Sequence, residues 1–207
     1  MTIRPVKHIR GMPRGSSRPQ LILFSDGRPY IVKFKNNPVQ GTRALVNEYV
    51  AGRLAQLLGL PVPPFKIVHI GKQFFKENPV LYRYRFRPGH QFASEYIPNC
   101  LKKIDKDSLS QLNIVNRKHI AGIVVFDQWV NNIDRRRRNI LLRPLSGDRG
   151  YQLFMIDQGH SFSYFDYWSH RRECRWTPAA LRFLPQKLKS NAFYRWCKQQ
   201  SRREDFD

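Results

Sequence analysis

The sequence predicts an α+β fold with two lobes: an N-terminal antiparallel sheet with one helix, and a short, mainly helical C-terminal lobe. Three observations predict it. Short runs with alternating apolar residues fill the first part of the chain. One helical pattern over 42–58 interrupts them and ends at Gly59, with Pro61 beyond. A longer apolar helical pattern and a hairpin follow after residue 100.

The strands of the first lobe are predicted from the alternation of apolar and polar residues. They are expected over residues 6–10, 20–25, 30–35, 65–70 and 80–86. The loop between the first two, Gly11 to Ser17, is rich in small residues. Residues 87–91, which contain a proline and a glycine, are expected to connect the two lobes.

The second lobe is expected to begin with a helix over 108–129. Its apolar stripe is wide, which indicates burial along most of its length. A hairpin is expected next, with strands over 139–142 and 151–156. The segment between them, 143–150, is dense in turn residues.

Three polar residues stand around this hairpin at a spacing that suits phosphoryl transfer. Asp134 precedes the hairpin, Asn139 stands five residues later at its start, and Asp157 stands at its end. A hairpin brings its two ends together, so we expect Asn139 and Asp157 to lie side by side. Their oxygens suit Mg²⁺, which makes them candidate metal ligands. Asp134 is the candidate catalytic residue, placed to position an attacking hydroxyl.

The first lobe supplies the residue types that hold the phosphates of ATP in a kinase. Small residues let backbone N–H groups approach phosphate oxygens, so Gly15, Ser16 and Ser17 are candidates for ATP binding. Lys33 lies on a partly apolar strand and Glu48 on a largely apolar helix, and we expect the two to pair. The alternatives are an edge-strand lysine in solvent and a solvated glutamate.

These segments resemble the HipA-like kinases, especially the small single-domain forms. The resemblance is carried by Tyr-Ile-Val-Lys-Phe at 30–34, Asn-Glu-Tyr-Val-Ala-Gly-Arg-Leu-Ala at 47–55, Leu-Gly-Leu-Pro-Val-Pro at 58–63, Phe-Asp-Gln-Trp-Val-Asn-Asn-Ile-Asp at 126–134, Asn-Ile-Leu-Leu at 139–142 and Met-Ile-Asp-Gln-Gly-His at 155–160. It implies a two-lobed protein-kinase-like fold, ATP and Mg²⁺ as cofactors, and phosphate transfer to Ser or Thr of a protein. It also implies a toxin–antitoxin setting, in which aminoacyl-tRNA synthetases are among the family's targets.

Carried over position by position, the resemblance assigns the contact with the α- and β-phosphates to Lys33 and the orientation of that lysine to Glu48. It assigns to Asp134, Asn139 and Asp157 the same roles as their spacing does. Family members also phosphorylate a serine of their own phosphate loop, which switches them off. In this chain that modification would fall on Ser16 or Ser17.

The chain departs from the family pattern in two places. Kinases usually carry His or Lys soon after the catalytic Asp, but Arg135–Arg138 fill that gap here. An arginine cannot accept a proton, although it can neutralise charge on the γ-phosphate. The segment after Gly159 is short, so substrate recognition by a fuller C-terminal lobe is not carried over. His160 is assigned a packing or capping role.

The net charge of +22 is the second strong indication of function in the sequence. Residues 171–204 hold ten Lys and Arg against two Glu, with aromatic residues between them, and short helices are expected near 177–181 and 191–200. Basic residues mixed with aromatics bind phosphate backbones and stack bases. The alternative is that the aromatics close a small core. The charge predicts an anionic partner: nucleic acid, an acidic protein or a membrane surface.

Three functions remain open on this evidence. The first is a HipA-like Ser/Thr protein kinase, toxin-like, with a protein substrate and an antitoxin partner. The second is a catalytically inactive kinase-fold protein that binds nucleic acid. The third is a phosphotransferase for small molecules or lipids. The complete set of candidate residues favours the first, because the loss of any one would cripple phosphoryl transfer.

The length of the chain fits a single kinase-like domain over 1–207, with 1–88 as the N-lobe and 89–207 as the C-lobe. No apolar run is long enough to span a bilayer, and the first residues lack the apolar core of a signal peptide. Cys100, Cys174 and Cys197 are scattered, without metal or disulfide spacing. A cytoplasmic location is therefore expected.

Overall fold

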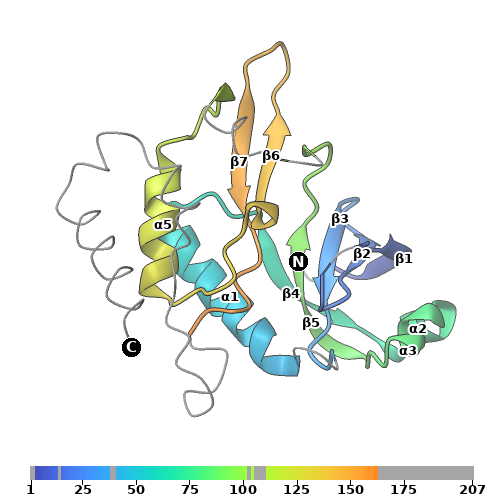
Figure 1. The fold of residues 1–207 in the computed structure, drawn as a ribbon. Coiled ribbons are helices and arrows are strands. Elements are labelled where there is room, and N and C mark those ends of the chain that lie inside the picture. The colour runs from blue at the N-terminus through green and yellow to red at the C-terminus, as the bar shows by residue number, and fades with distance from the viewer. Residues whose placement is uncertain (1–2, 14, 38–40, 102–103, 105–110, 163–207) are drawn as a thin grey trace.

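The computed structural model describes residues 3–13, 15–37, 41–101, 104 and 111–162 (Figure 1). A five-stranded sheet forms the first half, and a two-stranded sheet with a helix forms the second. The helices predicted near 177–181 and 191–200 lie outside the described residues. Within the described ranges, no helix combines the length and apolar character needed to cross a membrane.

The large sheet is antiparallel throughout, with the strand order β1-β2-β3-β5-β4. Its strands are β1 (Pro5–Gly11), β2 (Gln20–Phe24), β3 (Pro29–Lys33), β4 (Phe65–Ile70) and β5 (Gly89–Glu95). The first four confirm the strands predicted over 6–10, 20–25, 30–35 and 65–70. Because side chains alternate along a strand, Val32 enters the core on one face and Lys33 points to the other.

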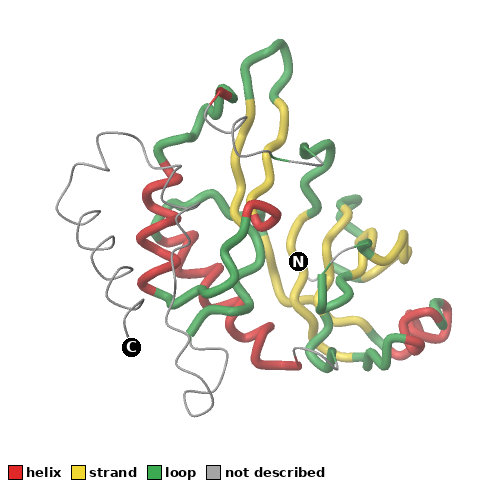
Figure 2. The backbone as a smooth tube through the Cα atoms, in the orientation of Figure 1, coloured by secondary structure: helices red, strands yellow, loops and turns green. Residues whose placement is uncertain are grey.

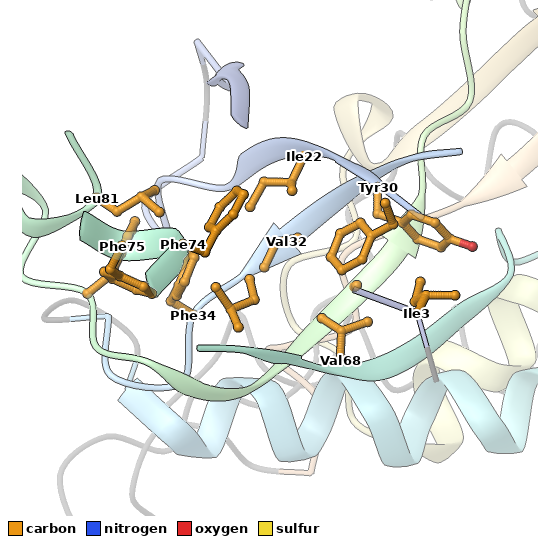
Figure 3. Packing of buried hydrophobic residues seen from close by; sticks show 13 residues of the cluster. Ile3, Ile22, Tyr30, Val32, Phe34, Val68, Phe74, Phe75 and Leu81 are labelled. Carbon is orange, nitrogen blue, oxygen red and sulfur yellow. The ribbon is translucent and has the colours of Figure 1, made fainter. Parts of the chain in front are cut away.

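One face of this sheet carries an aromatic core that holds the strands together (Figure 3). Phe34 stacks on Phe86 with ring centroids 4.3 Å apart and meets Phe75 edge-on. Phe75 belongs to the short helix α2 (Lys72–Glu77), which covers this face together with α3 (Val80–Arg83). Burial of large aromatic side chains supplies much of the stability of such a lobe.

The strand predicted over 80–86 is wrong, because Val80–Arg83 form one helical turn instead. Pro79 adopts helical dihedrals before it, and the left-handed backbone of Arg85 ends it, so that Phe86 turns into the aromatic core. The fifth strand is β5, which includes most of the predicted connector 87–91. The sheet therefore extends to Glu95, past the predicted lobe division at residue 88.

Helix α1 (Gly41–Leu57) confirms the helix predicted over 42–58 and lies between the two halves of the molecule (Figure 1). On one side Leu45 packs with Phe65 and Phe92 of the large sheet. On another side Ala51 and Ala55, both fully buried, belong to a second core. These small side chains allow close packing, so α1 is shared by both cores.

The second core is built by α5 (His119–Trp129) and the hairpin of β6 (Ile140–Pro144) and β7 (Tyr151–Met155). The hairpin confirms the strands predicted over 139–142 and 151–156. In Figure 2 its two strands extend away from the helices, and the 3₁₀ turn η1 (Arg137–Asn139) lies at its base. The hairpin therefore presents its base, rather than its tip, to α1.

Of the helix predicted over 108–129, the described residues form α5 from His119 to Trp129, and Gln111 is also helical, but the segment between them is not. Residues 105–110 lie outside the described ranges, and residues 112–118 are turns and an isolated bridge from Ile114 to Tyr151. The side chain of Asn116 replaces a strand neighbour there, because it donates to the Leu153 carbonyl at 3.0 Å and accepts from the Leu153 N–H at 2.9 Å. Asn side chains that bond to backbone in this way compete with helix formation.

The contact between α1 and β4 leads to a prediction about Gly52. A Cβ at this position would lie 2.7 Å from the Phe65 ring, whereas a Cβ at Gly122 of α5 would meet only the flexible end of Leu60, at 2.9 Å. Overpacking costs about 1–3 kcal/mol, and helix propensity returns roughly 1. We expect Gly52→Ala to lower the free energy of unfolding by up to about 2 kcal/mol in urea denaturation. The matched variant Gly122→Ala should be near neutral, and equal losses would contradict this packing.

Candidate active site

Lys33, the last residue of β3, contacts two carboxylates from distant parts of the chain. Its Nζ lies 3.1 Å from Glu48 Oε1 on α1 and 2.8 Å from Asp157 Oδ1, just after β7. The expected pairing of Lys33 with Glu48 is therefore present, and Asp157 joins it. Only 12 % of the Lys33 side chain and 5 % of the Glu48 side chain is exposed, so this is a buried ionic cluster rather than a surface pair.

The pKa values of the three groups reflect this arrangement. Burial by itself would lower the pKa of Lys33, but Asp157 and Glu48 outweigh it and the pKa is raised. The pKa of Asp157 is lowered, chiefly by the charge of Lys33. Burial raises the pKa of Glu48, and Lys33 opposes this only in part. Lys33 therefore remains a fixed cation at the junction of the two halves.

Helix α1 also holds the chain that follows Asp157. The φ of Asp157 is +65°, a conformation that costs a non-glycine residue about 1–3 kcal/mol. Asn47 Nδ2 donates to the carbonyl of Gly159 at 3.1 Å and to that of Ser161 at 2.6 Å. Gly159 lies so close to the helix that a Cβ there would come within 3.2 Å of Glu48 Oε2. Asn47 and Glu48, adjacent in sequence, thus position the loop and the lysine respectively.

The hairpin brings Asn139 next to the Asp157 segment, as its spacing predicts. The N–H of Ile156 donates to the Asn139 carbonyl at 3.0 Å. Asn139 is buried, and its Nδ2 donates to the Asp134 carbonyl at 2.7 Å and approaches Asp134 Oδ2 at 3.5 Å. All three candidates therefore lie at the base of the hairpin.

Arg135, the first of the four arginines, has a structural role that the sequence did not reveal. It makes a two-pronged contact with Asp127 of α5, with Nε to Oδ2 at 2.8 Å and Nη2 to Oδ1 at 3.1 Å. Its Nη1 donates to the carbonyls of Asn139 and Ile156. Because one planar guanidinium serves all these acceptors, Arg135 ties α5 to both ends of the hairpin. An Asp within the apolar pattern of α5 was the only sequence signal.

Asp134 has two basic neighbours. Arg136 Nε lies 2.7 Å from Oδ1, and His160 Nδ1 lies 3.6 Å from Oδ2. Burial would raise the pKa of Asp134, but His160 and Arg136 outweigh it and the pKa is lowered. The sequence assigned His160 to packing or capping, yet the structure places it beside the candidate catalytic residue. In the sequence, only the short separation between Asp157 and His160 indicates that His160 lies near the site.

The loop between β1 and β2 opens at the end of the sheet that carries Lys33, because Gln20 at the start of β2 pairs with Val32. Gly15 has a φ of +113° and accepts a hydrogen bond from the Arg18 N–H at 3.0 Å, which closes a turn. Ser16 is exposed, whereas Ser17 is buried. Phosphate binding by Gly15, Ser16 and Ser17 stays a prediction.

The oxygens around the hairpin base suit a magnesium–nucleotide complex. The Asn139 amide nitrogen is committed to Asp134, so its oxygen is the atom suited to a metal, and the Asp157 carboxylate is about one-third exposed. Among the residues that the structure describes, no group of three or more His, Cys, Asp or Glu could hold a metal by itself.

The sheet packed on α1, and the Asp–Asn–Asp set at the base of a hairpin, supply the residue types that phosphoryl transfer needs. A family model described as HipA-like kinase matches residues 6–171. The match covers most of the chain, so the chain belongs to the HipA-like kinase family, which confirms the resemblance seen in the sequence.

Among the solved structures similar to this chain is the crystal structure of a proinflammatory kinase, CtkA, from Helicobacter pylori. The TM-score is 0.52 at 17 % sequence identity, and the alignment covers 79 % of this chain. It covers 60 % of that chain, so this protein spans less than two-thirds of the kinase it resembles. The likeness confirms a kinase-like fold. No curated protein matches the sequence.

The buried cluster predicts the effect of removing its cation. Lys33→Met leaves two carboxylates facing each other, so the free energy of unfolding at pH 7 should fall by about 3 kcal/mol, the lower end for breaking a buried pair. The matched variant Lys66→Met removes a partly exposed lysine 3.8 Å from Asp26 and should cost less than about 1 kcal/mol. Urea denaturation of both variants measures this.

The same variant should show a defined pH dependence. The pKa of Glu48 is already raised above its ordinary 4.5, and loss of Lys33 raises it further. A carboxyl group whose pKa is higher in the folded state binds protons more tightly there than in the unfolded state. The loss of stability caused by its charge therefore becomes smaller as the pH falls. The deficit of Lys33→Met relative to wild type should therefore narrow from pH 7 toward 4.5. A deficit that stays constant over this window would contradict a buried Glu48 carboxylate that depends on Lys33.

Proposed function

We propose that this chain is an ATP- and Mg²⁺-dependent kinase that transfers the γ-phosphoryl group to a Ser or Thr hydroxyl of a protein. The observation that carries the proposal is the convergence of Lys33, Glu48 and Asp157 with Asp134 and Asn139 at the junction of the two halves. These are the cation, the oxygen donors and the acceptor-positioning carboxylate that phosphoryl transfer needs.

On the nucleotide side, Lys33 is the charge that would contact the phosphates. The ion pair with Glu48 holds the Nζ of Lys33 in place, and little of the lysine side chain is exposed to solvent. Asn139 and Asp157 would hold Mg²⁺, which when bound neutralises charge on the phosphates. The backbone conformation of Asp157 already places its side chain at the site. Its carboxylate, which now contacts only Lys33 in this cluster, would contact both the lysine and the metal.

On the acceptor side, Asp134 would orient the attacking hydroxyl. Its lowered pKa keeps it ionised and makes it a weak base, so it accepts a hydrogen bond rather than removing the proton in advance. This suits a loose transition state, in which positioning matters more than nucleophile activation. Arg136, 60 % exposed and 2.7 Å from Asp134 Oδ1, is placed to neutralise charge on the transferred group.

The proposed acceptor is an anionic partner. Arg136, Arg137 and Arg138 follow Asp134 after the less exposed Arg135 and are all exposed, and the net charge of the chain is +22. Exposed cations beside a transfer site raise the local concentration of negatively charged substrates. An acidic protein, or a protein bound to RNA, fits this charge. The toxin-like role and the antitoxin partner implied by the family stay predictions.

Calorimetry of ATP binding tests the nucleotide site. We expect wild type to bind ATP more tightly with Mg²⁺ than with EDTA, and Asp157→Ala to lose this difference because a metal ligand is gone. Asp134→Ala, the matched carboxylate variant, should bind Mg²⁺–ATP nearly as wild type does. Absence of Mg²⁺-dependent binding by the wild-type protein would refute the proposed cofactor.

Transfer of labelled phosphate tests the acceptor. Wild type should label acidic proteins in a mixture and should not label aminoglycosides or lipid vesicles, and Asp134→Ala should reduce labelling by at least about a hundredfold. Labelling of a small molecule or lipid alone would favour the corresponding phosphotransferase. Normal labelling by Asp134→Ala would remove that residue from the mechanism.

A further inference from the structure

Both carboxylate oxygens of Asp134 have a neighbour from the chain itself. Arg136 Nε lies 2.7 Å from Oδ1, while His160 Nδ1 and Asn139 Nδ2 lie 3.6 Å and 3.5 Å from Oδ2. Only 13 % of the Asp134 side chain is exposed. We therefore expect an acceptor hydroxyl to reach a carboxylate oxygen by displacing one of these neighbours.

Arg136 is the neighbour that can move most easily. The side chain of His160 is 15 % exposed, and Asn139 is buried and also donates to the Asp134 carbonyl. The side chain of Arg136, by contrast, is 60 % exposed. Ion pairs with such an exposed partner are weak, because water competes for the charge. Arg136 can thus release Oδ1 while the buried neighbours of Asp134 stay in place.

The backbone of Arg136 is held on both sides, so only its side chain has to rotate. Arg135, the residue before it, is anchored to Asp127 at 2.8 Å. The carbonyl of Arg136 accepts a hydrogen bond from the Asn139 N–H at 2.9 Å, at the start of η1. A guanidinium that leaves Oδ1 therefore stays within reach of a molecule bound beside Asp134.

We propose that Arg136 masks Asp134 in the free chain, and that an anionic side chain of the acceptor protein, next to the acceptor hydroxyl, draws the guanidinium away. Arg136 thereby selects Ser or Thr residues that stand beside an acidic or a phosphorylated residue. The acceptor part of the inference rests on the proposed function, whereas the mask does not. The role of Arg136 during transfer is retained, because the displaced guanidinium still lies beside the hydroxyl that receives the phosphoryl group.

Hydrogen-bond geometry sets the spacing of this anion. The hydroxyl, the Asp134 oxygen, the guanidinium and the anion follow one another at contacts of roughly 2.7–2.9 Å, so the anion lies within about 8 Å of the hydroxyl. Consecutive Cα atoms are about 3.8 Å apart, which places the anion one or two residues from the acceptor. A guanidinium binds a carboxylate or phosphate through two parallel N–H···O bonds, so such an anion competes well with Asp134.

A neutral acceptor lacks this competitor, and Arg136 then stays on Oδ1. The departure of Arg136 also changes Asp134 itself. Arg136 is one of the groups that hold the pKa of Asp134 below its ordinary value. Its removal raises that pKa, so Asp134 becomes a stronger hydrogen-bond acceptor as the hydroxyl arrives. The acidic acceptor therefore gains access to Asp134 and a better acceptor atom together.

NMR of the arginine Nε–H groups in the full chain tests the mask without turnover. The Arg136 signal, assigned by its loss in Arg136→Lys, should shift in Asp134→Asn. It should also shift with an alanine-based peptide in which one Ser stands between two Asp residues, the Asp peptide. The same peptide with Asn for Asp, the Asn peptide, should leave it unmoved. The signal of Arg138, also exposed, is the control for general attraction to the basic chain. An Arg136 signal that ignores Asp134→Asn would overturn the mask.

Labelling of the two peptides with Mg²⁺–ATP tests the selection. Wild type should label the Asp peptide at least about tenfold faster than the Asn peptide, as expected for one charged hydrogen bond. Arg136→Gln should reduce this ratio to near one, and the matched Arg138→Gln should keep it. A ratio compares two acceptors within one variant, so a general loss of rate cancels. A phosphoserine peptide that outruns the Asp peptide would identify phosphate as the preferred anion.

The remaining outcomes also decide the inference. Equal labelling of both peptides by wild type, or an undiminished ratio in Arg136→Gln, would overturn it. Labelling of neither peptide, with an Arg136 signal that responds to neither, would overturn it as well. If wild type binds no Mg²⁺–ATP, the proposed function fails, and the NMR response to Asp134→Asn still decides the mask.

Discussion

The structure depends on one ionic contact, in which a lysine kept out of water is shared by carboxylates from both halves. An isolated buried ammonium is too costly to persist, so Lys33 stays charged only while Glu48 and Asp157 are in place. The three residues come from β3, α1 and the end of β7, and the sheet, the helix and the hairpin must all be assembled before they meet. The ionic cluster is therefore a product of the fold as well as part of the site.

Helix α1 converts this contact into a complete site. Glu48 reaches the lysine, Asn47 reaches the carbonyls of the loop, and the small residues Ala51 and Ala55 let the same helix enter the second core. Arg135 plays the corresponding part at the base of the hairpin, where one guanidinium serves several acceptors. Asn47 and Arg135 thus hold backbone carbonyls at the ends of the hairpin and in the loop after it.

The sequence predicted the features that depend on local pattern: four strands of the sheet, α1, the hairpin, and the approach of Asn139 to Asp157. It failed where a tertiary partner decides the conformation. Residues 80–86 have the composition of a strand, but the aromatic core draws Phe86 inward, and the Asn116 side chain pairs with β7 where a helix was expected. The roles of Arg135 and His160 were missed for the same reason, because nothing in the local sequence reveals which acceptor a basic side chain will reach.

The sharing of α1 by two cores also limits how the molecule can move. Ala51 and Ala55 are fully buried, and Gly52 between them faces the Phe65 ring with no room for a methyl group. A hinge that opened the halves would have to expose one of these faces. Sliding of α1 along its own axis keeps both faces covered, and shear of this kind between packed elements is a common way for proteins to switch. In this protein, a small translation of α1 would withdraw Glu48 and Asn47 together, so the lysine and the loop would be released in one step.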